Sequence, residues 1–196
     1  MKIHEENIRK AFKCFTNQDI MLKIFIPCYN EEKAIENNVK NIYKIVSSQF
    51  KRFKIYVIDD GSTDNTQNIV KKLKLKNFQY IKCNVPSIRE NLVQSMSKYS
   101  KSDDIVGFMD ADRSTGEEAL KLAIDAIAKK NYDIVIGSRY TKGSKIKRKL
   151  DRRLISLLFN NFVRLYFNSK IKDHECGFKF FKARILKELV KELGIN

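Results

Sequence analysis

The chain has 196 residues, which is enough for one domain with a hydrophobic core of its own. Its hydrophobic content of 43% and charged content of 32% are typical of a folded globular protein and exclude a largely disordered one. The formal net charge of +16 indicates a polyanionic partner, such as nucleic acid, an anionic membrane surface or a phosphorylated small molecule. Much of this excess can also be lysine on solvated helix faces.

The cysteines and the apolar runs narrow the class further. Cys14, Cys28, Cys83 and Cys176 are far apart and form no Cys-x-x-Cys pair, so the sequence predicts neither a zinc site nor a redox motif, but reduced thiols in a cytoplasmic protein. No run of about 18 apolar residues occurs, and the first residues lack the apolar core of a signal peptide. We therefore expect a protein that does not cross a membrane by itself.

Predicted strands and helices alternate along most of the chain. An amphipathic helix over residues 2–16 indicates that residues 1–20 are an N-terminal helical extension without visible chemistry. A strand over residues 22–26 is expected to stop at Pro27, and Asn30 is expected to cap the helix that follows. Further strands are predicted at residues 54–58, 78–81, 105–109 and 132–136, with helices after the turn at 59–64 and at residues 87–99 and 117–129. This alternation predicts an α/β fold in which a mainly parallel sheet has helices on both faces.

The pattern changes after Ile136. A basic cluster follows, which consists of Arg139, Lys142, Lys145, Lys147, Arg148, Lys149, Arg152 and Arg153. A strongly apolar helix is predicted over residues 150–167, and its narrow polar edge is formed by Arg153, Ser156, Asn160 and Arg164. Because a surface helix needs an apolar stripe only a little wider than ~100°, this helix has apolar surface left over. We expect an anionic membrane to cover it, with a protein partner or a second copy of the chain as the alternative.

Two carboxylates, Asp110 and Asp112, directly follow the predicted strand at residues 105–109. Residues at i and i+2 of an extended backbone project to the same side, so both can share one divalent cation and its phosphate ligands. In open α/β sheets, ligands bind at the carboxyl ends of the strands. The alternative is an acidic turn that caps the next helix, and the same alternative applies to Asp59 and Asp60.

Four short motifs carry a family resemblance. They are Ile26-Pro-Cys-Tyr-Asn-Glu31-Glu32, Val57-Ile-Asp-Asp-Gly-Ser-Thr-Asp64, Met109-Asp-Ala-Asp112 and Gly137-Ser-Arg-Tyr140. In this order and spacing they resemble glycosyltransferase family 2, inverting enzymes with a nucleotide-sugar-binding, Rossmann-like α/β domain of the GT-A type. The later segment Lys172-Asp-His-Glu-Cys-Gly-Phe-Lys179-Phe-Phe resembles the polyprenyl-phosphate branch, and looks most like dolichyl-phosphate β-glucosyltransferases.

The resemblance implies a role for each matching residue. Pro27, Tyr29 and Glu31 would surround the base and ribose of the nucleotide, and Asp60 would contact the base edge. Asp110 and Asp112 would hold Mg²⁺ or Mn²⁺ against the donor diphosphate, with Ala111 and Ser114 beside it. Arg139 would bind the donor diphosphate, whereas Arg152, Arg153 and Ser156 would bind the acceptor phosphate. A phosphate monoester is already anionic near neutral pH, so no strong general base is required, and the candidates for that role are Asp112 and Asp173.

The implied function is the transfer of a hexose to a polyprenyl or dolichyl phosphate by a protein bound peripherally to the cytosolic face of a membrane. The donor would be UDP-glucose or, alternatively, GDP-mannose. Two alternatives come from other classes: a nucleic-acid-binding domain that uses residues 139–153, and a non-catalytic scaffold, which the departure of residues 83–99 from the family pattern motivates. Against the first, the basic cluster adjoins an apolar helix rather than base-stacking aromatic residues.

The same resemblance sets an expectation for the carboxyl end. Residues 21–196 would form the GT-A domain and would lack the C-terminal part usual in the family, because the sequence ends soon after a helix predicted at residues 183–193. We therefore expect acceptor positioning to be impaired or to depend on a second polypeptide. Either part of the sheet or residues 179–181 are expected to be less covered, which would favour a homodimer.

Overall fold

The computed structural model describes residues 21–84, 87–110, 117–138, 160–161, 163–166, 168–169, 171 and 173–195. The predicted N-terminal extension and the whole basic cluster lie outside these residues. The strands are β1 (Leu22–Cys28), β2 (Phe53–Asp59), β3 (Phe78–Lys82), β4 (Ile105–Met109), β5 (Ile134–Ile136) and β6 (Phe178–Lys182). The helices are α2 (Ile35–Gln49), α3 (Thr66–Lys71), α4 (Ile88–Lys98), α5 (Glu117–Lys130) and α7 (Ala183–Glu192).

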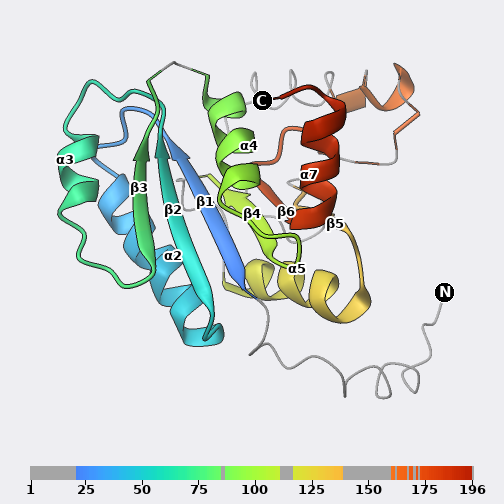
Figure 1. Cartoon of the computed structure of the whole chain (residues 1–196), viewed down its shortest axis with the longest axis horizontal. Coiled ribbons are helices and arrows are strands. Elements are labelled where there is room, and N and C mark those ends of the chain that lie inside the picture. Colours follow the sequence, from blue (N-terminus) through green and yellow to red (C-terminus); the bar gives the residue numbers. More distant parts are fainter. Residues whose placement is uncertain are drawn as a thin grey trace.

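Within the described residues, the strands form a six-stranded sheet in the order β3-β2-β1-β4-β6-β5 (Figure 1). β1 lies between β2 and β4 and is parallel to both, and β3 is parallel to β2. β6 is antiparallel to both of its neighbours, β4 and β5. The prediction of a mainly parallel sheet is confirmed. The sequence pattern does not predict β6, which separates β5 from β4.

Helices cover both faces of the sheet, as the sequence predicts (Figure 1). One core cluster joins the strands to α2, α3 and α5 through Val39, Val70 and Ile124. The other joins them to α4 and α7 through Leu92 and Leu186. Burying one such side chain contributes roughly 1.5–3 kcal/mol, so these two layers hold the sheet in place from both sides.

β1 continues through Pro27 to Cys28, so the prediction that it stops at the proline is wrong. The last residue pair between β1 and β4 is Phe25 with Phe108, and Pro27 lies beyond it. The missing N–H of the proline therefore removes no hydrogen bond from that ladder. On its other side, β1 stays paired with β2 as far as Cys28.

Residues 179–181 lie inside the sheet, so the alternative that these residues are poorly covered is wrong. They belong to β6, and Phe180 is 0% exposed. The Phe180 ring lies against Gly107 of β4, where a Cβ atom would overlap it. Glycine at position 107 therefore gives the ring its space.

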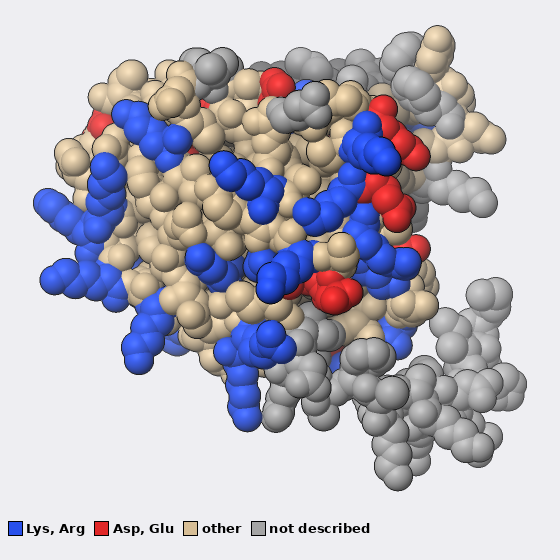
Figure 2. Space-filling view, viewed as in Figure 1, with Lys and Arg blue, Asp and Glu red and all other residues tan. Residues whose placement is uncertain are grey.

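Lysine and arginine side chains are spread across the face of the molecule that carries α4 and α7 (Figure 2). Acidic side chains lie among them near α7, and the basic side chains on this face do not gather into one stripe. A nucleic-acid backbone is usually tracked by a clustered basic patch. The charge on this face is therefore better explained by lysines on a solvated surface.

Candidate functional site

The carboxyl ends of β2, β1 and β4 lie side by side, because these strands are parallel neighbours in the sheet. Cys28 at the end of β1 pairs with Asp59 at the end of β2, and its carbonyl accepts a hydrogen bond from the Asp60 N–H at 3.0 Å. Asp110 follows β4 directly. Three of the predicted motifs therefore meet at the edge of the sheet where ligands bind in open α/β folds.

The loops after β1 and β2 are joined by Asn30. Its side-chain oxygen accepts the N–H of Thr63 at 2.8 Å and of Asp64 at 3.3 Å, and its own N–H donates to Ser62 Oγ at 3.0 Å. Its φ of 53° is a conformation that asparagine tolerates better than most residues. The prediction that Asn30 caps the next helix is wrong, because α2 begins only at Ile35 and the Asn30 side chain holds the neighbouring turn instead.

Glu31 and Glu32 add further hydrogen bonds between these two loops. The Glu31 N–H donates to Thr66 Oγ1 at 2.8 Å, and the Glu32 N–H donates to Asp64 Oδ2 at 3.0 Å. In return, Glu32 Oε2 accepts the Asn65 N–H at 3.0 Å. Desolvation alone would raise the pKa of Asp64, but hydrogen bonds from Thr66 and Glu32 lower that pKa below its ordinary value.

Asp59 is a structural residue of the turn. It is 0% exposed, and its two oxygens accept hydrogen bonds from the Ser62 N–H at 2.8 Å and the Tyr80 hydroxyl at 2.6 Å. Burial, together with the hydrogen bond to Asp59, raises the pKa of Tyr80. The turn-forming alternative therefore holds for Asp59, and Tyr80 is a partner that no local sequence signal reveals.

Asp60 lies beneath the start of α4. It is 7% exposed, and its Oδ1 accepts hydrogen bonds from the Ser87 N–H at 3.1 Å and from the Asn91 side-chain amide. The carboxylate thus fixes the amino end of α4 beside the loops after β1 and β2. Its contact with a nucleotide base stays a prediction, and the contact with α4 is one that the sequence analysis misses.

The residues expected around the base and ribose lie at the end of β1. Tyr29 is 51% exposed, whereas Pro27 and Glu31 are half-buried. An exposed tyrosine ring offers a flat surface on which a base can stack. The structure therefore brings Pro27, Tyr29 and Glu31 together with Asp60 at one edge.

Asp110 is exposed at the end of β4, as expected for a metal ligand. Its N–H donates to the Gly177 carbonyl at 2.8 Å, and its carboxylate occupies the space that a side chain at position 177 would need. An exposed carboxylate offers the oxygen ligands that Mg²⁺ and Mn²⁺ prefer, so this residue fits a divalent cation. Across the part of the chain that the structure describes, no group of three or more His, Cys, Asp or Glu side chains gathers around a common metal position.

The remaining predicted site residues are not placed. Ala111, Asp112, Ser114, Arg139, Arg152, Arg153 and Ser156 lie outside the described residues. Their roles stay predictions.

The loop over residues 173–177 contains Asp173, which is one of the two candidate bases, and His174 beside it. Asp173 is 0% exposed, which favours a structural role because a general base must reach the substrate; its role as a base stays a prediction. The N–H and Nδ1 of His174 lie 2.7 and 3.0 Å from Asn160 Oδ1, and its Nε2 lies 3.0 Å from Ser169 Oγ. His174 therefore joins this loop to Asn160 and Ser169.

The helical residues 160–161 and 163–166 turn the predicted polar edge partly inward. Asn160 is only 2% exposed, and the hydrogen bonds that its side-chain oxygen makes with His174 compensate for its burial. Leu165 and Tyr166, by contrast, are 85% and 73% exposed. The described part of this helix therefore has exposed apolar surface, as the sequence predicts.

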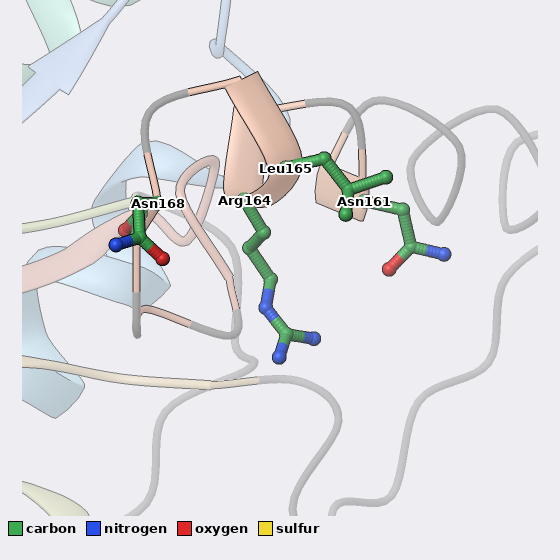
Figure 3. Close-up of a pocket in the computed structure, with 5 residues that line it drawn as sticks. Asn161, Arg164, Leu165 and Asn168 are labelled. Carbon is green, nitrogen blue, oxygen red and sulfur yellow. The ribbon is translucent and has the colours of Figure 1, made fainter.

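A hollow of about 600 Å³ lies beside these residues (Figure 3). It is lined by Asn161, Arg164, Leu165, Asn168 and Ser169. The Arg164 side chain extends away from the helical turn, between Asn161 and Asn168 (Figure 3). Guanidinium and amide groups around an open space suit an anionic group, and Leu165 adds an apolar side.

The fold and the strand ends define the class of the protein. A largely parallel α/β sheet with helices on both faces and polar residues at the carboxyl ends of its strands is the arrangement of nucleotide-binding α/β domains. The profile of the family described as Glycosyl transferase family 2 matches residues 23–190. The chain therefore belongs to glycosyl transferase family 2, as its motifs predict.

Two curated relatives are similar to most of this chain. The dolichyl-phosphate beta-glucosyltransferase of Saccharomyces cerevisiae is 30% identical over 198 residues, which cover 87% of this chain and 58% of that protein. The dolichol-phosphate mannosyltransferase of Pyrococcus furiosus is 32% identical over 184 residues, which cover 89% of this chain and 49% of that protein. The predicted resemblance to the polyprenyl-phosphate branch is confirmed, although the chain spans only about half the length of these relatives.

A solved structure confirms the GT-A fold. It is the crystal structure of glucosyl-3-phosphoglycerate synthase from Mycobacterium tuberculosis in complex with Mn²⁺ and UDP-glucose. The TM-score is 0.65 at 16% sequence identity, and the match covers 100% of this chain and 71% of that chain.

Proposed function

We propose that the chain is an inverting hexosyltransferase that binds a nucleoside-diphospho-hexose and transfers the sugar to a polyprenyl phosphate. The observation that carries this proposal is the meeting of three strand ends, at which Tyr29, Asp60 and Asp110 lie at one edge of a GT-A sheet. The family and the names of the two relatives, both lipid-phosphate glycosyltransferases, support the reaction class.

The donor is proposed to lie across the ends of β1, β2 and β4. Tyr29 stacks on the base, and Asp60 contacts its edge while remaining fixed to α4. Asp110 and Asp112 hold Mg²⁺ or Mn²⁺, which when bound neutralises the charge that grows on the departing diphosphate. Arg139 binds the same diphosphate with its guanidinium group.

The acceptor is proposed to approach from the side of Arg164 and Leu165. Arg152, Arg153 and Ser156 bind its phosphate, which needs positioning more than a strong general base. The hollow beside Arg164 and Leu165 supports an acceptor at this side, because it combines a cation with an apolar wall. A phosphate attached to a hydrocarbon chain has the same two properties.

The donor is proposed to be UDP-glucose, with GDP-mannose as the alternative. Both relatives match this chain at similar identity, so identity does not separate the two sugars. The preference for glucose rests on the Cys176-Gly-Phe-Lys179 segment, which resembles the glucosyltransferases.

UDP is expected to bind more tightly with Mn²⁺ than without it, because the ion links the site's carboxylates to the diphosphate. UDP is also expected to bind more tightly than GDP, because the proposed donor is UDP-glucose. Isothermal titration of the purified chain with each nucleotide, with and without Mn²⁺, measures both differences. Labelled glucose should then pass from UDP-glucose to a short polyprenyl phosphate. Tighter binding of GDP would change the donor to GDP-mannose, and binding of neither nucleotide would favour the scaffold alternative.

We also propose that the helix containing Leu165 and Tyr166 lies on an anionic membrane surface. Both side chains are mostly exposed, and the basic cluster precedes them in the sequence. Each basic residue near such a surface adds about 1 kcal/mol, so peripheral attachment needs no membrane span. Among the helices within the described ranges, none has both the length and the apolar character needed to cross a bilayer.

The variant Leu165→Gln/Tyr166→Gln is expected to bind acidic liposomes at least tenfold more weakly than the unchanged chain in a flotation assay at low salt. The reason is that burying one such side chain contributes roughly 1.5–3 kcal/mol, and tenfold corresponds to about 1.4 kcal/mol. Leu122→Gln is the matched control, because Leu122 is 63% exposed on α5, away from this helix. Unchanged flotation of the double variant, or a stable dimer that does not float, would refute the membrane assignment.

A further inference from the structure

We propose that the loop over residues 173–177 orients the Asp110 carboxylate toward a divalent metal, with Gly177 and Lys179 as its positioning residues. The inference rests on the proposed function, since it concerns the metal that Asp110 would hold. It adds to the two aspartates a supporting loop that lies more than 60 residues further along the sequence.

Gly177 makes room for the Asp110 carboxylate. The ladder between β4 and β6 ends at Met109 and Phe178, and the next residues stay together through the Asp110 N–H, which donates to the Gly177 carbonyl at 2.8 Å. A Cβ atom at position 177 would overlap the carboxylate itself. Gly177 does not have a positive φ, so the site needs glycine there for space and not for backbone conformation. Any larger residue would force Asp110 into another rotamer.

Lys179 holds the same loop from the side of the sheet. Its ammonium group donates to the carbonyls of Cys176 at 2.9 Å and His174 at 3.2 Å, and lies 5.2 Å from the centre of the Phe108 ring. Phe108 and Lys179 are also partners in the β4–β6 ladder. One cation therefore holds two loop carbonyls through charge-assisted hydrogen bonds and contacts the strand that ends just before Asp110.

The other side of the loop is fixed by His174. Its contacts with the buried Asn160 and with Ser169 connect the loop to residues 160–169. A metal ligand must be held within a narrow range of orientations by its surroundings, and this loop is anchored on both sides to do so. The loop thereby connects the proposed metal position with the proposed acceptor side.

Gly177→Ala is expected to weaken Mn²⁺ binding by ~10–100-fold, the usual effect of changing a residue that supports a metal ligand. The metal-free affinity for UDP should stay unchanged. Free Mn²⁺ is measured by electron paramagnetic resonance during titration of the chain in the presence of UDP, and metal-free binding by calorimetry. Gly107→Ala is the control: its methyl group meets the Phe180 ring, so it should lower Tm without changing Mn²⁺ affinity.

A further variant keeps the test decisive. Lys179→Met should weaken Mn²⁺ binding about tenfold by releasing the loop carbonyls, and it decides the matter if Gly177→Ala does not fold. A chain with no Mn²⁺-dependent binding would refute the proposed function. Normal binding by the unchanged chain together with unchanged binding by Gly177→Ala or Lys179→Met would refute the positioning role alone.

Discussion

Asp110→Asn is expected to abolish the Mn²⁺-dependent part of UDP binding while the fold stays intact. Asp110 is exposed just beyond the end of β4, so an isosteric amide there should change the free energy of unfolding by no more than about 0.5 kcal/mol. Changing a residue that only supports a ligand costs about 10–100-fold in metal affinity, and losing the ligand itself should cost at least ~100-fold. The metal-free affinity for UDP should remain, because Tyr29 and Asp60 are unchanged.

Calorimetric titration with UDP, with and without Mn²⁺, measures this loss, and thermal unfolding checks the fold. The matched control is Asp103→Asn, which neutralises an exposed carboxylate at the opposite end of the same strand. It should bind UDP and Mn²⁺ normally. Normal binding by both Asp110→Asn and Asp112→Asn would remove the basis for a metal at this edge.

Lys23→Met is expected to lower the free energy of unfolding by about 3–5 kcal/mol, because it leaves the Asp104 carboxylate buried without its cation. Lys23 and Asp104 are 8% and 6% exposed, and the Lys23 Nζ lies 2.6 Å from Asp104 Oδ2. The same ammonium group donates to the Tyr99 carbonyl at 2.7 Å, and Asp104 Oδ2 also accepts the Lys101 N–H at 2.6 Å. These contacts join the start of β1 to the end of α4 and the start of β4.

Denaturant unfolding followed by circular dichroism measures the loss. Lys40→Met is the control, because the Lys40–Glu36 pair has the same 2.6 Å separation but side chains that are 55% and 49% exposed. Exposed pairs contribute about 0–1 kcal/mol, so this variant should lose little. Lys23→Met/Asp104→Asn should recover much of the stability, since no buried charge remains. Equal losses at Lys23 and Lys40 would show that burial does not set the strength of these pairs.

The positions of most strands and helices follow from the sequence alone, because their signals are local. β4 lies at Ile105–Met109, where an apolar run followed by Asp110 predicts it. The helices after β1, β2 and β3 likewise follow from apolar residues at helical spacing. The candidate site was predictable in the same way, because each motif directly follows a strand and the carboxyl ends of parallel strands share one edge of a sheet.

What the sequence did not reveal depends on contacts between distant residues. The strand order places β6 between β4 and β5, and no local pattern specifies a strand's neighbours. Asn30 looks like a helix cap in the sequence, but its side-chain oxygen accepts the N–H groups of Thr63 and Asp64, which lie 33 and 34 residues further along the chain. The need for glycine at position 177 becomes clear only from Asp110, because the Asp110 carboxylate fills the space that a side chain at position 177 would occupy. Only the tertiary structure shows which distant residues contact one another. The hydrogen bonds and contacts in such a pair form only when folding brings the two segments of backbone together.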